Sequence, residues 1–162
     1  FLENLFTKLG QRIPGLVLRT SLIAGLPFED EDAFDELCSF LREVRIERAG
    51  VFPYSPEEGT AAAKMLNRVD TTEAERRAEL IVDVQSDIMD DFNESRMGEI
   101  TEVLCEGWDS QSMSYVGRSY AESPDIDGRI YFTADGDVAS GEFVNVRITG
   151  SMDGELTGEL VE

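Results

Sequence analysis

Three consecutive polar residues, Arg19, Thr20 and Ser21, interrupt an otherwise apolar run over residues 16–24. Such a run predicts a strand that is covered on both sides, as in a parallel sheet. A guanidinium in that setting could pair with a carboxylate of a bound ligand or with an acidic neighbour of the same chain, and the sequence leaves both open. Gly25 follows the run and also has two interpretations: it lets a ligand approach the backbone closely, or it makes the turn into the next element.

Other residue types that support chemistry are sparse. The chain has no histidine, and Cys38 and Cys105 lie in different parts of it, without the spacing of a metal-binding or redox pair. Both are predicted to be buried thiols. The acidic residues 29–32 could suggest a metal site, but negative charge at the start of a helix is the favoured explanation.

The elements that position these residues follow from hydrophobic periodicity. A short helix is predicted over residues 2–9 and is followed by the strand over residues 16–24. A second helix starts near residues 29–32 and carries apolar residues at helical spacing up to Val44. A second strand over residues 49–54 completes a strand-helix-strand unit, and such units are parallel and right-handed in nearly all known sheets.

The second half of the chain begins with a helix and then changes period. Thr72 and Glu75 have the spacing of a capping box and predict the start of a long amphipathic helix, with Arg77 among its polar positions. From Gly98 onward the period is two, and turn residues separate five predicted strands: 100–105, 115–120, 129–133, 143–148 and 156–160. Strands of this number and length predict a small closed barrel of the OB type, which has no free sheet edges.

Charge restricts the partners of this β-rich part. The chain has a formal net charge of −20, and residues 97–162 contain three arginines, no lysine and fourteen acidic residues. Nucleic-acid affinity rests largely on lysine and arginine that neutralise phosphates, so this part is expected to repel RNA and to suit a basic protein partner. Acidity that serves only solubility is the alternative.

The sequence favours a cytoplasmic protein without membrane contact. Its apolar runs are shorter than the roughly 18 residues that a membrane helix needs. The first residues lack the basic start and apolar core of a signal peptide.

Four segments of the chain, taken in order, resemble one family. They are residues 13–25 (IPGLVLRTSLIAG), residues 50–60 (GVFPYSPEEGT), the long helix that leads to Met97-Gly98, and residues 117–128 (GRSYAESPDIDG) with the GEFV of residues 141–144. Together they resemble the radical-SAM methylthiotransferases, and specifically the RimO branch, which modifies an aspartate on a small-subunit ribosomal protein. The resemblance covers nearly the whole chain.

This resemblance implies a fold of α/β plus all-β class. Residues 1–96 would be the C-terminal portion of a partial (β/α) radical-SAM barrel with a connector helix, and residues 97–162 would be a small five-stranded OB-like TRAM β-barrel. The enzyme so implied uses S-adenosylmethionine and 4Fe-4S clusters to add a methylthio group to the β-carbon of the aspartate. The family's CxxxCxxC triplet, which supplies the cluster's thiolate ligands, is not among these residues. The chain is therefore expected to be a C-terminal fragment that is inactive alone.

The same resemblance implies a cofactor site in the first part. Active sites of such barrels lie at the C-terminal ends of the strands. Arg19, Thr20, Ser21 and Gly25 are therefore candidates for binding S-adenosylmethionine. Nearby, Phe28 stands where the family usually has glycine.

In the TRAM part, Arg118, Tyr120, Asp125 and Asp127 are candidates for binding the basic ribosomal protein. Loops and exposed strands are the usual binding surface of OB-like barrels. For the two aspartates, turn chemistry is an equally good explanation.

Two further interpretations stay open. A tRNA-modifying enzyme of the same family would share the architecture, but its TRAM domain should carry a basic stripe for phosphates. A non-catalytic acidic binding module would need no cofactor, but the first part has too few predicted strands for a sheet that is covered on both faces.

Overall fold

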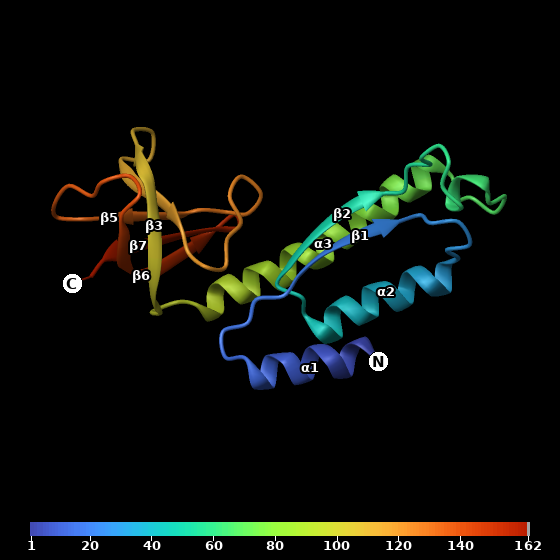
Figure 1. Ribbon diagram of the computed structural model, residues 1–162, viewed down its shortest axis with the longest axis horizontal. Coiled ribbons are helices and arrows are strands. Elements are labelled where there is room, and N and C mark those ends of the chain that lie inside the picture. Colours follow the sequence, from blue (N-terminus) through green and yellow to red (C-terminus); the bar gives the residue numbers. More distant parts are fainter. Residues whose placement is uncertain (162) are drawn as a thin grey trace. The chain divides into compact units, whose positions relative to one another are not determined.

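The hydrophobic side chains gather into two separate cores, and the chain divides into two units accordingly. The computed structural model describes residues 1–161 (Figure 1). Unit 1 is Phe1–Ile88 and unit 2 begins at Met89, so α3 (Thr71–Ser95) contributes most of its turns to unit 1 and its last turns to unit 2. The predicted fold class is confirmed, because helices and a parallel strand pair precede a closed β-barrel.

Unit 1 is a parallel strand pair with its helices. Its elements are α1 (Leu2–Arg12), β1 (Arg19–Ala24), α2 (Glu31–Val44), β2 (Arg48–Pro53), the 3-10 helix η1 (Ala62–Lys64) and most of α3. β1 and β2 pair in parallel over their whole lengths. β1 is shorter than the strand that was predicted over residues 16–24. α1 is longer than the helix that was predicted over residues 2–9, because it continues through Gly10 to Arg12. Gly10 lies on an exposed helix surface, where glycine weakens a helix by about 1 kcal/mol without ending it.

One face of the β1–β2 pair packs against α2 and α3. Leu22 and Ala24, which alternate along β1, lie on this face. The side chains buried with them are Phe34, Cys38 and Leu41 from α2, and Ala78, Ile81, Val84 and Ile88 from α3. Full burial of a side chain such as Leu41 or Ile81 stabilises the unit by about 1.5–3 kcal/mol.

The two longer helices of unit 1 begin at aspartates. Asp30 caps α2, where its Oδ1 accepts a hydrogen bond from the backbone N of Ala33 at 2.9 Å. At the start of α3, Oδ1 of Asp70 accepts from the backbone N of Thr72 at 3.0 Å. Thr72 therefore lies inside the first turn, and the predicted capping box with Glu75 is wrong. None of the helices formed by residues 1–161 is long and apolar enough to cross a bilayer.

Unit 2 is a closed barrel of five strands that follows the end of α3. The strands are β3 (Ile100–Asp109), β4 (Ser114–Arg118), β5 (Ile130–Thr133), β6 (Phe143–Met152) and β7 (Glu155–Leu160). They are hydrogen-bonded in the order β3-β4-β5-β7-β6 and close on β3, with β5 and β7 parallel and the other neighbours antiparallel. All five predicted strands are confirmed, and each has two neighbours, as expected of an OB-like barrel.

The barrel interior is filled by alternate residues of the strands. Its buried side chains are Val103, Cys105, Ile130, Phe132, Val146, Ile148 and Leu156. A close approach of β3 and β4 requires a glycine in β4, since a Cβ on Gly117 would lie 2.4 Å from the carbonyl oxygen of Leu104. The first glycine of the GRSYAESPDIDG segment is thus explained by strand packing.

Candidate functional site

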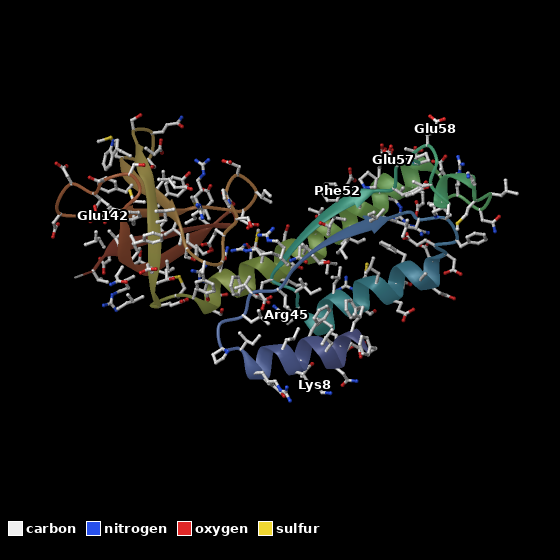
Figure 2. The ribbon with its side chains drawn as sticks, viewed as in Figure 1. Lys8, Arg45, Phe52, Glu57, Glu58 and Glu142 are labelled. Atoms are coloured by element: carbon white, nitrogen blue, oxygen red, sulfur yellow. The ribbon has the colours of Figure 1, made fainter. Side chains whose placement is uncertain are left out.

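The β1–β2 pair has a second face that is open to solvent. It carries Arg19, Ser21 and Ile23 of β1, and Phe52 of β2 is the register partner of Ile23. Ile23 and Phe52 are 47% and 56% exposed, and Figure 2 shows Phe52 on β2. Because parallel sheets are normally covered on both faces, this face is a surface on which a ligand or further protein would pack.

The three polar residues that were predicted to form one group lie on two different faces of β1. Arg19 and Ser21 are exposed on the open face, while Thr20 is half-buried on the opposite face. All three lie in the first half of β1, and only Gly25 follows its carboxyl end. Binding of S-adenosylmethionine by these four residues stays a prediction, and Arg19 and Ser21 are the two whose side chains are exposed enough to reach a ligand.

Gly25 is buried where the chain leaves β1. Its φ is +81°, a conformation that favours glycine, and a Cβ at this position would lie 2.3 Å from the Cβ of Ala74 in α3. Its backbone N donates a hydrogen bond to Oε1 of Glu29 at 2.9 Å. The packing of α3 therefore requires glycine here, with or without a ligand.

Phe28 occupies a left-handed conformation in the turn that follows Gly25. Its φ is +69°, its side chain is 62% exposed, and its backbone N donates to the carbonyl oxygen of Asn67 at 2.8 Å. A bulky residue rarely adopts this conformation. The loop that follows β2 carries the exposed Glu57 and Glu58, which lie beyond the end of the strand in Figure 2. Strain and exposed charge thus occur in segments that follow the carboxyl ends of the two strands.

A buried arginine organises the acidic start of α2. Arg77, predicted at a polar surface position of α3, is buried instead, and its guanidinium forms ion pairs with Glu29 at 3.0 Å, Glu31 at 2.7 Å and Glu73 at 2.8 Å. Burial by itself would lower the pKa of Arg77, but these carboxylates outweigh it and raise the pKa above its ordinary value. Hydrogen bonds from Arg76 and Arg77 lower the pKa of Glu73 to about 2. Glu29 and Glu31 therefore balance a buried charge.

A second buried charge cluster lies in unit 2. Arg96 donates through Nη1 to Oε1 of Glu122 at 2.6 Å and through Nη2 to Oγ of Ser119 at 3.1 Å. The backbone N and Oγ of Ser119 donate to Oε2 of Glu122 at 2.9 and 2.6 Å. Burial would raise the pKa of Glu122, but the hydrogen bonds from Ser119 and the charge of Arg96 outweigh it and lower the pKa. No signal in the sequence predicts this pair, because its members are 26 residues apart and follow no periodic pattern.

This cluster anchors the first half of the GRSYAESPDIDG segment. Next to Ser119, Arg118 is half-buried and pairs with Glu106 at 2.8 Å. Tyr120 is 64% exposed. Of these two predicted partner-binding residues, Tyr120 has an exposed side chain next to the buried cluster that holds the backbone, whereas Arg118 already forms an ion pair within the barrel.

The second half of the segment is a turn. Asp125 is exposed and has φ +60°, while Oδ2 of Asp127 accepts a hydrogen bond from the backbone N of Ser123 at 2.6 Å. That bond is the turn chemistry expected of aspartate. Partner binding by Arg118, Tyr120, Asp125 and Asp127 stays a prediction.

The cysteines do not fit the cluster that the family resemblance implies. Cys38 is buried in the core of unit 1 and Cys105 in the core of unit 2. Burial raises the pKa of both thiols, which disfavours the thiolate that ligates iron. Residues 1–161 also contain no group of three or more histidine, cysteine, aspartate or glutamate residues placed to hold a metal ion.

Comparison with known proteins relates both units to one kind of enzyme. The sequence model of the TRAM domain family matches residues 97–161. The chain is 43% identical over 155 residues to the ribosomal protein uS12 methylthiotransferase RimO of Clostridium botulinum (strain Okra), an alignment that covers 96% of this chain and 34% of the relative. It is 41% identical over 160 residues to the protein of the same name from Acetivibrio thermocellus, covering 99% and 35%. The corresponding protein of Pelotomaculum thermopropionicum is 43% identical over 159 residues, covering 98% and 36%. The chain thus spans about a third of the length of these relatives.

Proposed function

We propose that the chain belongs to the RimO branch of the methylthiotransferases and acts as part of an enzyme that adds a methylthio group to the β-carbon of an aspartate in ribosomal protein uS12, in the cytoplasm. The observation that carries this proposal is identity of 41–43% to three proteins of that name over nearly the whole chain. The TRAM match over residues 97–161 supports it independently.

In this proposal unit 1 contributes one wall of the reaction chamber. S-adenosylmethionine and 4Fe-4S clusters, when bound, supply the radical chemistry, and the cluster thiolates come from protein outside these residues. The open face of β1–β2 is the part of unit 1 suited to the chamber, since it joins polar groups at Arg19 and Ser21 to apolar surface at Ile23 and Phe52. Arg19 would hold a carboxylate of the cofactor or of the substrate aspartate. Gly25 would set the backbone path at the carboxyl end of β1. This chain alone is expected to be inactive.

Unit 2 contributes recognition of the substrate protein. Its TRAM part carries three arginines and fourteen acidic residues, so a basic protein is attracted and RNA is repelled. The exposed Tyr120 and Asp125 would contact uS12, and the buried Arg96–Glu122 pair would hold their backbone in place before binding.

The first test is binding of the 162-residue chain to purified uS12 and, in parallel, to bulk tRNA over a salt series. We expect binding to uS12 that weakens as salt rises, because opposite charges attract across the interface. Binding to tRNA alone would assign the chain to a tRNA-modifying branch. Activity is tested separately with the full-length enzyme: mass spectrometry should detect replacement of one hydrogen of the uS12 aspartate by a methylthio group.

A further inference from the structure

The barrel of unit 2 has a groove whose lining includes none of the residues predicted to bind the partner. It has a volume of about 570 Å³ and is lined by residues of β5 and β7 and by the turns that join β3 to β4 and β6 to β7. Ligand sites in proteins have volumes of about 300–1,000 Å³. The third strand, β5, and the connections from β3 to β4 and from β6 to β7 belong to the surface through which OB-type barrels commonly bind ligands. The groove therefore has the size and the place of a binding site.

The lining of the groove combines apolar surface with negative charge. Tyr131 of β5 is half-buried, and Met152, in the last position of β6, is 72% exposed. Asp109 is the last residue of β3 and Glu155 is the first residue of β7, and the described residues that line the groove include no lysine or arginine. Hydrogen bonds from Ser112 lower the pKa of Asp109, so this carboxyl is ionised at neutral pH. An occupant of the groove would meet an aromatic ring and two carboxylates.

The surrounding charges make a nucleic acid an unsuitable occupant. Four basic residues follow Met89, and each interacts with a carboxylate of unit 2. The pairs are Arg96 with Glu122 at 2.6 Å, Arg118 with Glu106 at 2.8 Å and Arg147 with Glu159 at 3.9 Å, and Arg129 interacts with the charge of Asp109. Since phosphate binding depends on cations that are available to the ligand, a basic protein segment is favoured over RNA.

Resting on the function proposed above, we propose that this groove holds an extended basic segment of the substrate protein, with a lysine or arginine side chain against Tyr131 and Glu155. The ring face attracts a cation, and the carboxylate of Glu155 accepts its hydrogen bonds. A closed barrel has no free strand edge, so the segment binds through its side chains and not as an added strand.

The test uses the 162-residue chain, purified uS12 and two matched pairs of variants. Glu155→Lys reverses charge in the groove, and Glu102→Lys makes the same change at an exposed position of β3 that does not line it. Tyr131→Ser removes the ring, and Phe143→Ser removes an exposed ring of β6 outside the groove. Circular dichroism checks that each variant is folded. We expect the two groove variants to weaken uS12 binding about ten-fold or more, and the two controls to change it less than about two-fold.

The outcomes separate the groove from the function on which it rests. Binding of uS12 that survives both groove variants would overturn the groove while leaving the proposed function in place. A chain that does not bind uS12 at all would overturn both. An oligouridylate probe is titrated in the same way, and if it binds and is weakened by Tyr131→Ser, the groove is assigned to RNA and the proposal fails.

Discussion

The two sheets of this chain differ in how completely their strands are paired and their faces are covered. β1 and β2 pair only with each other among the described residues, and the face that carries Ile23 and Phe52 is exposed. Every strand of unit 2 has a neighbour on both sides, and its core is enclosed. The barrel therefore contains the interactions that it needs to fold alone, whereas the strand pair is complete only when other protein covers it.

The chain offers separate optical probes for this comparison. Trp108, the single tryptophan, lies in unit 2 with its ring 5.0 Å from that of Tyr115 in an edge contact. The helical signal in far-ultraviolet circular dichroism comes mostly from unit 1, which contains α1, α2 and most of α3. We expect two transitions in denaturant, with the helical signal lost first and the tryptophan signal second.

The largest expected effect comes from Phe132→Ala, which would destabilise the barrel of unit 2 but not unit 1. Phe132 is fully buried in the core of unit 2 and stacks on Tyr115 at 5.5 Å. Truncation of such a ring lowers the free energy of unfolding by about 3–5 kcal/mol. The loss should appear in the Trp108 transition, measured by fluorescence, and leave the helical transition unchanged. Thr133→Ala, at the exposed neighbouring position, should stay within about 0.5 kcal/mol. An equal shift of both transitions would show that the two units unfold together.

A smaller effect in unit 2 is expected from Glu122→Gln. This change leaves Arg96 buried without its 2.6 Å carboxylate partner, and loss of one member of a buried pair costs about 3 kcal/mol. The control is Glu106→Gln, whose partner Arg118 is half-exposed, so that about 1 kcal/mol or less should be lost.

The pH dependence of this difference has a definite sign. The pKa of Glu122 is lower in the folded chain than its ordinary value of 4.5, so its contribution to stability is complete above that pH and is lost as the pH falls below it. The difference in the free energy of unfolding between wild type and Glu122→Gln should therefore become smaller as the pH is lowered, as measured by Trp108 fluorescence in denaturant titrations at each pH. A gap that stays constant from pH 7 to pH 3 would contradict the role of the ionised carboxylate.

The features that could be predicted from sequence are those with a local period. The alternation of Val144, Val146 and Ile148 with polar residues located β6, and helical spacing located α2 from Phe34 onward. Such patterns record which side of an element is buried, and a few neighbouring residues are enough to read them.

The features that were missed join distant residues. Arg77 was predicted at the surface, because nothing near it in the sequence shows that Glu29 and Glu31, which lie 48 and 46 residues away, surround its guanidinium. The groove beside Tyr131 and Glu155 is likewise made by turns and strands from separate parts of unit 2. The family motif over residues 117–128 includes residues that the structure explains without a partner. Gly117 is required by the close packing of β3 and β4, and Asp127 accepts a hydrogen bond within its own turn.

In unit 1, Gly25→Ala would sharpen the comparison by showing how closely α3 approaches β1. The added Cβ meets the Cβ of Ala74 at 2.3 Å, so that overpacking should destabilise unit 1 by about 1–3 kcal/mol in the helical transition. Gly59→Ala is the matched control, because Gly59 has a similar φ of +87° but nothing within 4 Å of its Cβ position. The double change Gly25→Ala with Ala74→Gly should recover part of the loss. A loss equal to that of Gly59→Ala would mean that backbone conformation alone requires the glycine.

The smallest effect is expected from Phe28→Gly, and its sign is the informative part. At φ +69° an aromatic residue is strained by about 1–2 kcal/mol relative to glycine, and the ring is 62% exposed, so its removal sacrifices little packing. The greater freedom of glycine in the unfolded chain offsets part of the gain, which leaves unit 1 more stable by about 0.5–1 kcal/mol in the helical transition. Phe52→Ala, which removes an exposed ring from a regular strand, should give no such gain. A loss of stability in Phe28→Gly would instead show that the ring packs within unit 1. A gain would show that Phe28 lowers the stability of unit 1. Such a cost is expected of a side chain that contacts protein or ligand packed on unit 1, and not of a side chain that packs in the unit's own core.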